Sequence, residues 1–143
     1  MAAESNRKQI AALPFRIAAG GRAEVLLVTS RETGRWIIPK GWPMKSRKPH
    51  EAAAQEALEE AGVKGSVRKE PIGQYVYWKR KSDHFVLCRV DVFPLEVSEQ
   101  LPTWREKGQR EARWFSPEDA AHHILEPDLA SLILGLPDHL SKA

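Results

Sequence analysis

Hydrophobic and polar residues alternate along several stretches of this chain, and the period of the alternation indicates a mixture of strands and helices. Residues 9–18 predict a strand broken at Pro14, and the Gly20-Gly21 pair predicts a turn into a second strand over residues 23–30. We therefore expect a β-hairpin at the start of the fold.

A loop and then a helix follow the hairpin. Residues 36–38 predict a short strand that ends at Pro39, and the ten residues after it hold too much proline and glycine for regular structure. The segment EAAAQEALEEAG, which starts at Glu51, is rich in residues of high helix propensity and stops at Gly62. This is the clearest helix signal in the chain.

The second half of the chain predicts more strands. Residues 67–78 and 84–93 form two long candidates, joined by a basic turn at residues 79–83. The second of them places small apolar side chains on one face: Val86, Cys88, Val90 and Val92.

The last third is polar at first and then helical. Residues 100–110 predict irregular structure, residues 111–115 a short strand, and Ser116 caps a helix with an acidic first turn. A final helix is expected over residues 128–134. This order of elements predicts an α/β (α+β) fold, in which a mixed β-sheet is sandwiched between α-helices.

The composition fits one domain. With 143 residues, 42% of them hydrophobic, the chain can build a single core over residues 9–143, after a flexible N-terminal tail at residues 1–8. Cys88 is the only cysteine, which excludes an intrachain disulfide and favours a reducing compartment. Because no apolar run is long enough for a signal or a membrane span, we expect a cytoplasmic protein without a membrane partner.

The charge points to an anionic ligand. The formal net charge is only +3, but the sequence pI is about 9.1 and the basic residues lie outside the acidic helix. Phosphate esters, nucleic acids and anionic lipids all satisfy this observation.

Three carboxylates give the predicted helix its chemistry. Glu56, Glu59 and Glu60 follow i, i+3, i+4 spacing, so they project from one face, where like charges repel. A solvated helix surface is the simplest interpretation of such a cluster. A hard cation such as Mg²⁺ would instead make it favourable. The opposite face is small enough to lie close against a sheet: Ala52, Ala53, Ala57 and Ala61.

The segment from Gly41 to Val63 resembles the Nudix box, G-x5-E-x7-R-E-U-x-E-E-x-G-U, where U is aliphatic. The matching residues are Gly41, Glu56, Glu59, Glu60, Gly62 and Val63. Two positions depart from the pattern, because Arg47 stands in place of Glu and Gln55 in place of Arg. In the family these two residues are thought to form a supporting salt bridge, so their joint loss strands no charge.

The resemblance implies a hydrolase that cleaves a phosphoanhydride with bound Mg²⁺ or Mn²⁺. It places the metal on Glu56, Glu59 and Glu60, with the backbone carbonyl of Gly41 as a further ligand. The clamped phosphate would then be attacked by a metal-oriented water. Glu51, in the first helical turn, fits better as a partner of the helix dipole than as a ligand.

The general base in this family usually lies outside the box. Glu106 and Glu111 lie in a segment that resembles the loop carrying it in some relatives, and we favour Glu106, although either could be an exposed loop residue. Candidate substrate contacts are Lys40, Trp42, Lys45, Arg47 and Lys48, with the basic turn at residues 79–81. These basic loops resemble the diphosphoinositol and diadenosine polyphosphate branch.

The sequence leaves two other functions open. The departures at Arg47 and Gln55 could mark a Nudix-fold nucleotide-binding module with weakened catalysis. The pI and five tryptophans could indicate a nucleic-acid-binding protein, but no recognition helix or stacking motif supports this. We therefore expect a small polyphosphate or nucleotide as ligand, bound by a monomer or a homodimer.

Overall fold

The computed structural model describes residues 7–142, so residues 1–6 of the expected N-terminal tail lie outside the described part. Two long strands, β1 and β7, form its centre. The elements in chain order are β1 (Lys8–Ile17), β2 (Ala23–Thr29), β3 (Trp36–Ile37), β4 (Lys40–Gly41), α2 (Pro49–Ala61), β5 (Val63–Val67), β6 (Gly73–Arg80), β7 (Phe85–Gln100), β8 (Ala112–Phe115), α3 (Pro117–His123) and α4 (Pro127–Ser141).

All strands belong to one mixed sheet, with β3, β2, β1, β7 and β5 side by side in that order. Strand β4 pairs with β1, β6 with β7, and β8 with β2. The β1–β7 pair is parallel and the other pairs are antiparallel. The expected first hairpin is confirmed as β1–β2.

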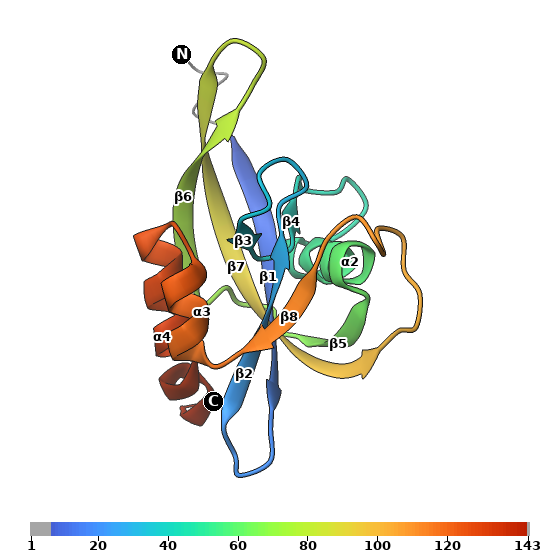
Figure 1. Cartoon of the computed structure of the whole chain (residues 1–143), viewed down its shortest axis with the longest axis vertical. Helices are drawn as coiled ribbons and strands as arrows, with labels where there is room; N and C mark the ends of the chain where they lie inside the picture. Colours follow the sequence, from blue (N-terminus) through green and yellow to red (C-terminus); the bar gives the residue numbers. More distant parts are fainter. Residues whose placement is uncertain (1–6, 143) are drawn as a thin grey trace.

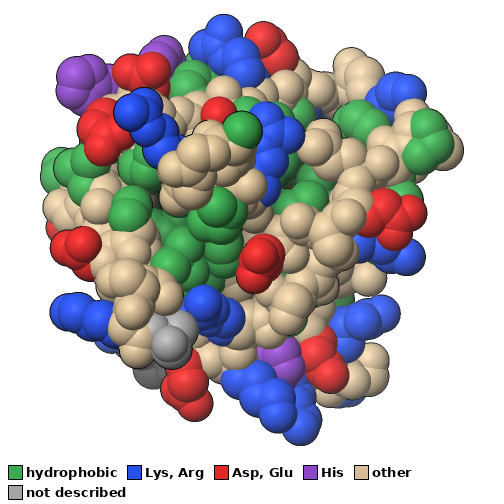
Figure 2. Space-filling view, turned by 90° about the horizontal axis from the view of Figure 1, so that it is seen from below, with side chains coloured by type: hydrophobic (Ala, Val, Ile, Leu, Met, Phe, Trp, Pro, Cys, Tyr) green, Lys and Arg blue, Asp and Glu red, His purple; other side chains and the backbone are tan. Residues whose placement is uncertain are grey.

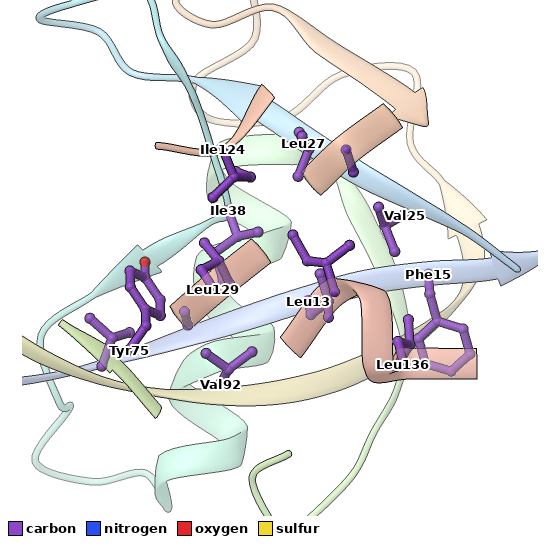
Figure 3. Packing of buried hydrophobic residues seen from close by; sticks show 14 of the residues in the cluster. Leu13, Phe15, Val25, Leu27, Ile38, Tyr75, Val92, Ile124, Leu129 and Leu136 are labelled. Carbon is purple, nitrogen blue, oxygen red and sulfur yellow. The ribbon is translucent and has the colours of Figure 1, made fainter. Parts of the chain in front are cut away.

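Helices cover both faces of this sheet, α2 on one side and α3 with α4 on the other (Figure 1). The alanines of α2 are buried against one face, and this closeness holds the helix near β1 and β4. On the other face, Leu129 and Leu136 of α4 pack toward Leu13, Val92 and Tyr75 (Figure 3). The predicted sheet between helices is confirmed.

Prolines interrupt the strands less than the sequence predicted. Strand β1 continues through Pro14, whose missing N–H falls before the β2 ladder starts at Phe15. Strand β7 continues past Pro94 to Gln100, and the Pro94 carbonyl accepts a hydrogen bond from the Arg68 N–H at 2.9 Å. The breaks expected at Pro14 and after Phe93 were therefore wrong, because each proline forfeits only one donor.

Other boundaries also differ from expectation. Strand β5 was not predicted, since VKGSV shows no alternation, and β6 starts at Gly73 rather than at residue 67. The residues after Pro39 include the two-residue strand β4. Helix α4 runs through Pro137 to Ser141, well beyond the predicted residues 128–134.

The ends of α2 follow the predicted signals closely. Pro49 occupies the first turn, and the Glu51 carboxylate accepts a hydrogen bond from the Lys48 N–H at 2.9 Å. At the other end Gly62 adopts φ 70°, which ends the helix in a left-handed conformation that favours glycine. The Lys48 hydrogen bond lowers the pKa of Glu51, so this residue acts as a cap of the helix.

No helix within residues 7–142 is long and apolar enough to cross a membrane. On the face of the molecule drawn in Figure 2, basic and acidic side chains are interspersed around a hydrophobic strip. That face therefore lacks the single-sign basic surface typical of nucleic-acid binding.

Candidate active site

A cleft of about 490 Å³ opens beside the carboxylate face of α2. Strands β1, β4 and β6, helix α2, the loop after β2 and the loop before β8 all contribute to its wall. The lining residues are Gln9, Ser30, Arg31, Glu32, Ile37, Lys40, Gly41, Trp42, Glu56, Glu60, Tyr77, Lys79, Glu106 and Arg110.

Glu56 and Glu60 form the acidic wall of the cleft. The Glu56 carboxylate lies so close to Gly41 that a Cβ at position 41 would force this carboxylate to shift. Glu60 is only 5% exposed, and its Oε1 atom has no hydrogen-bond partner within the described residues. Burial raises the pKa of both carboxyls, that of Glu60 to about 8, and their mutual interaction adds to the shift at Glu60.

Glu59 does not join this pair. Its Oε2 accepts a hydrogen bond from Gln55 Nε2 at 2.7 Å, and its Oε1 lies 3.4 Å from the Arg105 guanidinium. Among residues 7–142, no three His, Cys, Asp or Glu side chains are arranged to hold a metal ion. Only two of the three predicted carboxylates therefore lie together here. The third, that of Glu59, contacts Gln55 and Arg105 instead.

The pair nevertheless fits a hard divalent cation. Mg²⁺ commonly takes one or two carboxylates and completes its shell with water and substrate phosphate oxygens. The carboxylates of half-buried Glu56 and buried Glu60, with a Glu60 oxygen that accepts no hydrogen bond within residues 7–142, supply such a donor set. Gly41 lies directly beside the Glu56 carboxylate, and its carbonyl stays a predicted further ligand.

The opposite wall is partly basic. Lys40 places Nζ 4.8 Å from the centre of the Tyr77 ring, and burial lowers the pKa of this lysine to about 8. The Tyr77 hydroxyl donates a hydrogen bond to Gln9 Oε1 at 2.6 Å, deep in the sheet. Lys79, two residues after Tyr77 on β6, also faces the cleft.

The irregular loop of residues 101–111 supplies the remaining side. Glu106 lines the cleft and accepts a hydrogen bond on Oε1 from Arg110 Nε at 2.8 Å. The alternative base, Glu111, is exposed, does not line the cleft, and binds the Thr29 hydroxyl through its backbone N–H. Position therefore favours Glu106 over Glu111.

The structure divides the predicted substrate contacts into two groups. Lys40 and Trp42 line the cleft, with Trp42 41% exposed at its surface. Lys45 and Arg47 are exposed and do not line it, so their contact with substrate stays a prediction. Arg47 instead borders a shallow groove on another side of α2, together with Gln55.

Sequence reasoning missed several cleft residues because they lie outside the box. Gln9 and Tyr77 lie in strands, and the pattern of polar residues there did not mark them as part of a site. Arg31 and Arg110 lie in polar loops, where a solvated side chain is the ordinary expectation. The i, i+4 spacing of Glu106 and Arg110 was the one available signal for the latter.

Comparison with known proteins agrees with this geometry. A family model described as the NUDIX domain matches residues 7–135. The chain is 34% identical over 105 residues to the Arabidopsis thaliana protein named Nudix hydrolase 13, mitochondrial, covering 69% of this chain and 52% of that protein. It is 38% identical over 120 residues to Diphosphoinositol polyphosphate phosphohydrolase 2 of Rattus norvegicus, covering 82% of this chain and 62% of that protein.

A solved structure extends the similarity to the fold. The binary complex of the C. elegans Ap4A hydrolase matches with a TM-score of 0.69 at 19% identity, covering 95% of this chain and 98% of that one. This chain spans about half to two thirds of the length of the two relatives above. The family model, the relatives and the box on α2 together establish that the chain belongs to the Nudix family.

Proposed function

We propose that this protein is a Mg²⁺- or Mn²⁺-dependent hydrolase that cleaves a phosphoanhydride in a polyphosphate substrate. The observation that carries the proposal is the pair of carboxylates of half-buried Glu56 and buried Glu60 beside Gly41, in which Oε1 of Glu60 accepts no hydrogen bond within residues 7–142. When bound, a divalent cation would neutralise charge on the phosphate oxygens and orient a water molecule. The carboxylates of Glu56 and Glu60 would hold it, and Glu59 would join them by exchanging its contact with Gln55.

Glu106 is the proposed general base. Its Oε1 is held by Arg110, while no hydrogen bond within residues 7–142 occupies Oε2, so Oε2 can accept a proton from water. Glu56 and Glu106 line the same cleft. A base so placed stands next to the group that would hold the cation.

The substrate class follows from the cationic side chains in the cleft. Arg31, Lys40 and Lys79 can contact more phosphate oxygens than one scissile anhydride provides. Trp42 at the surface of the cleft can stack on a base or cover a bulky group. We therefore propose a dinucleoside polyphosphate or a diphosphoinositol polyphosphate, a choice supported by the name of the rat relative.

The test is a phosphate-release screen of the full chain with Mg²⁺ or Mn²⁺. The substrates are dinucleoside polyphosphates, diphosphoinositol polyphosphates, nucleotide sugars and nucleoside triphosphates. We expect metal-dependent cleavage that is strongest on the first two classes and is lost in Glu106→Gln. Glu111→Gln is the matched control, because it changes a glutamate of the same loop that does not line the cleft.

A catalytically weakened binding module is the second candidate, favoured by Gln55 and by the contact that draws Glu59 away from the pair. It predicts that the same compounds raise the melting temperature without being cleaved. Cleavage by the wild-type chain that is lost in Glu60→Gln would exclude the binding module.

A further inference from the structure

The loop of residues 101–111 is attached to the C-terminal end of α2. The Leu101 N–H donates to the Gly62 carbonyl at 2.8 Å, and the Glu106 N–H donates to the Glu59 carbonyl at 3.0 Å. The Trp104 ring covers Gly62 so closely that a Cβ there would collide with it. The loop, which runs beside α2 in Figure 1, thus satisfies carbonyls that the helix end would otherwise leave free.

Arg110 adds a buried side-chain link to these backbone contacts. Its side chain is only 9% exposed. Nε donates to Glu106 Oε1 at 2.8 Å, Nη1 donates to the Thr29 carbonyl at 3.1 Å, and Nη2 lies 3.9 Å from Glu60 Oε1. One guanidinium therefore touches strand β2, the loop and the acidic face of α2.

The charges explain why a cation belongs at this point. Glu56, Glu60 and Glu106 face the same cleft, and the helix position where the Nudix box has arginine holds the neutral Gln55. Within residues 7–142, the ion pairs of Glu60 and of Glu106 both go to Arg110. The planar guanidinium of arginine suits this position, because its N–H donors can bind several acceptors in fixed geometry.

We propose that Arg110 is a positioning residue, which fixes Glu106 against the metal-binding face of α2. This inference rests on the proposed function, because it acts through the general base Glu106. Arg110 itself need not touch the reacting atoms.

The proposal predicts opposite effects on metal binding and on turnover. Removing Arg110 takes a positive charge from the neighbourhood of Glu60, so a divalent cation should bind as tightly as before or more tightly. Glu106 would at the same time lose the donor that orients it, so the chemical step should slow. Simple damage to the fold would weaken both.

The experiment compares Arg110→Met and Arg110→Lys with Arg105→Met in the full chain. Arg105 is a matched control, since it lies in the same loop and pairs with a box glutamate at 3.4 Å, but its side chain is 74% exposed. Four quantities are measured: Mn²⁺ affinity, kcat and KM on the substrate found in the screen, and the melting temperature.

For Arg110→Met we expect kcat to fall about a hundredfold, KM to change by less than about threefold, and Mn²⁺ to bind equally or more tightly. Arg110→Lys should have a higher kcat than Arg110→Met, because lysine keeps the positive charge although it lacks the planar guanidinium. Arg105→Met should stay within about threefold of wild type, as expected for an exposed pair.

Unchanged kcat in Arg110→Met, or Mn²⁺ affinity that falls in parallel with kcat, would overturn the proposal while leaving the proposed function intact. If Arg110→Met does not fold, Arg110→Lys decides, and wild-type kcat in that variant overturns the idea. A wild-type chain that binds no Mn²⁺ and cleaves no phosphoanhydride would instead remove the proposed function, and this inference with it.

Discussion

Two loops flank helix α2, and they differ in how they are held. The box loop, residues 42–48, belongs to the motif, yet Lys45 and Arg47 are exposed and the backbone hydrogen bond of Arg47 goes to nearby Met44. The loop of residues 101–111 lies outside the motif, yet it is bonded to the helix and brings Glu106 and Arg110 to the cleft. Nearness to a motif in sequence is therefore a poor guide to nearness in the site.

The difference has a physical origin. The box loop only has to deliver Gly41 to the carboxylate of Glu56 and then start the helix at Pro49, so side chains such as Lys45 and Arg47 can stay in water. The second loop must satisfy the carbonyls at the other end of the helix, and this requirement pulls it across the acidic face.

The largest effect should come from the helix itself. We expect Glu60→Gln to lower kcat on the order of a hundredfold or more, because a cation ligand is lost, while KM changes less. The melting temperature of the metal-free variant should stay level or rise, since glutamine avoids the cost of burying an ionisable carboxyl. Kinetics with added Mg²⁺ and a thermal melt check both parts. Near-normal Mg²⁺-dependent turnover would remove Glu60 from the site.

We expect the same change at Glu59 to lower kcat by a similar factor if Glu59 turns toward the cation when it binds. Because Glu59 now contacts Gln55 and Arg105, the Glu59→Gln measurement tests whether this side chain moves, which the Glu60→Gln measurement does not. Wild-type turnover in Glu59→Gln would mean that the cation needs only the Glu56–Glu60 pair.

A smaller effect should separate the two sets of basic residues. Lys79→Gln should raise KM for a polyphosphate by about tenfold with little change in kcat, because Lys79 lines the cleft and a charge-assisted contact is lost. Lys45→Gln is the control, and we expect less than a twofold change, since Lys45 is exposed outside the cleft. The Lys79 effect should shrink at high salt. An equal rise in KM in both variants would show that the box loop also contacts the substrate.

Much of this arrangement could be predicted from the sequence. The Ala/Glu pattern and Gly62 defined α2, and the alternation at Val86 to Val92 defined the centre of β7, because both rest on local periodicity. The box spacing also gave the cleft residues Gly41, Glu56 and Glu60.

The rest depended on tertiary contacts that leave no local signal. Strand β5 exists because it pairs with the extension of β7 beyond Pro94, and its own sequence, VKGSV, does not alternate. Tyr77 meets Gln9 across the sheet from 68 residues away, and Arg110 reaches Thr29 from 81 residues away. Such side chains reach the site through the topology of the sheet.

The pH dependence of stability should distinguish the two ends of α2. Burial raises the pKa of Glu60 from its ordinary value of 4.5 to about 8, so the folded state holds a proton that the unfolded state has released. Its contribution is therefore greatest below pH 4.5 and is lost as the pH rises to about 8. Glu51 has a lowered pKa, so its contribution has the opposite sign and is lost only as the pH falls below 4.5.

We accordingly expect the melting temperature of the metal-free protein to fall by several degrees between pH 5 and pH 8, and this trend to flatten in Glu60→Gln. Glu51→Gln should keep this fall in melting temperature, because Glu51 affects stability only at lower pH. Saturating Mg²⁺ should also reduce the trend, since the cation stabilises the ionised carboxylate. A slope that persists unchanged in Glu60→Gln would assign it to another group.

The smallest effect is expected at the departures from the box. Arg47 and Gln55 border the same groove away from the cleft, so Gln55→Arg would bring two guanidinium groups to one exposed region. It would also compete with Arg105 for Glu59, which Gln55 now binds at 2.7 Å. Both effects involve partly exposed charges, each worth less than about 1 kcal/mol, so kcat should stay level or fall by less than about fivefold. The double change Arg47→Glu with Gln55→Arg replaces the repulsion by a pair of opposite charges and should return kcat to the wild-type value. A strong gain in turnover from Gln55→Arg alone, with nothing added by Arg47→Glu, would show that the two departures from the box do not compensate each other.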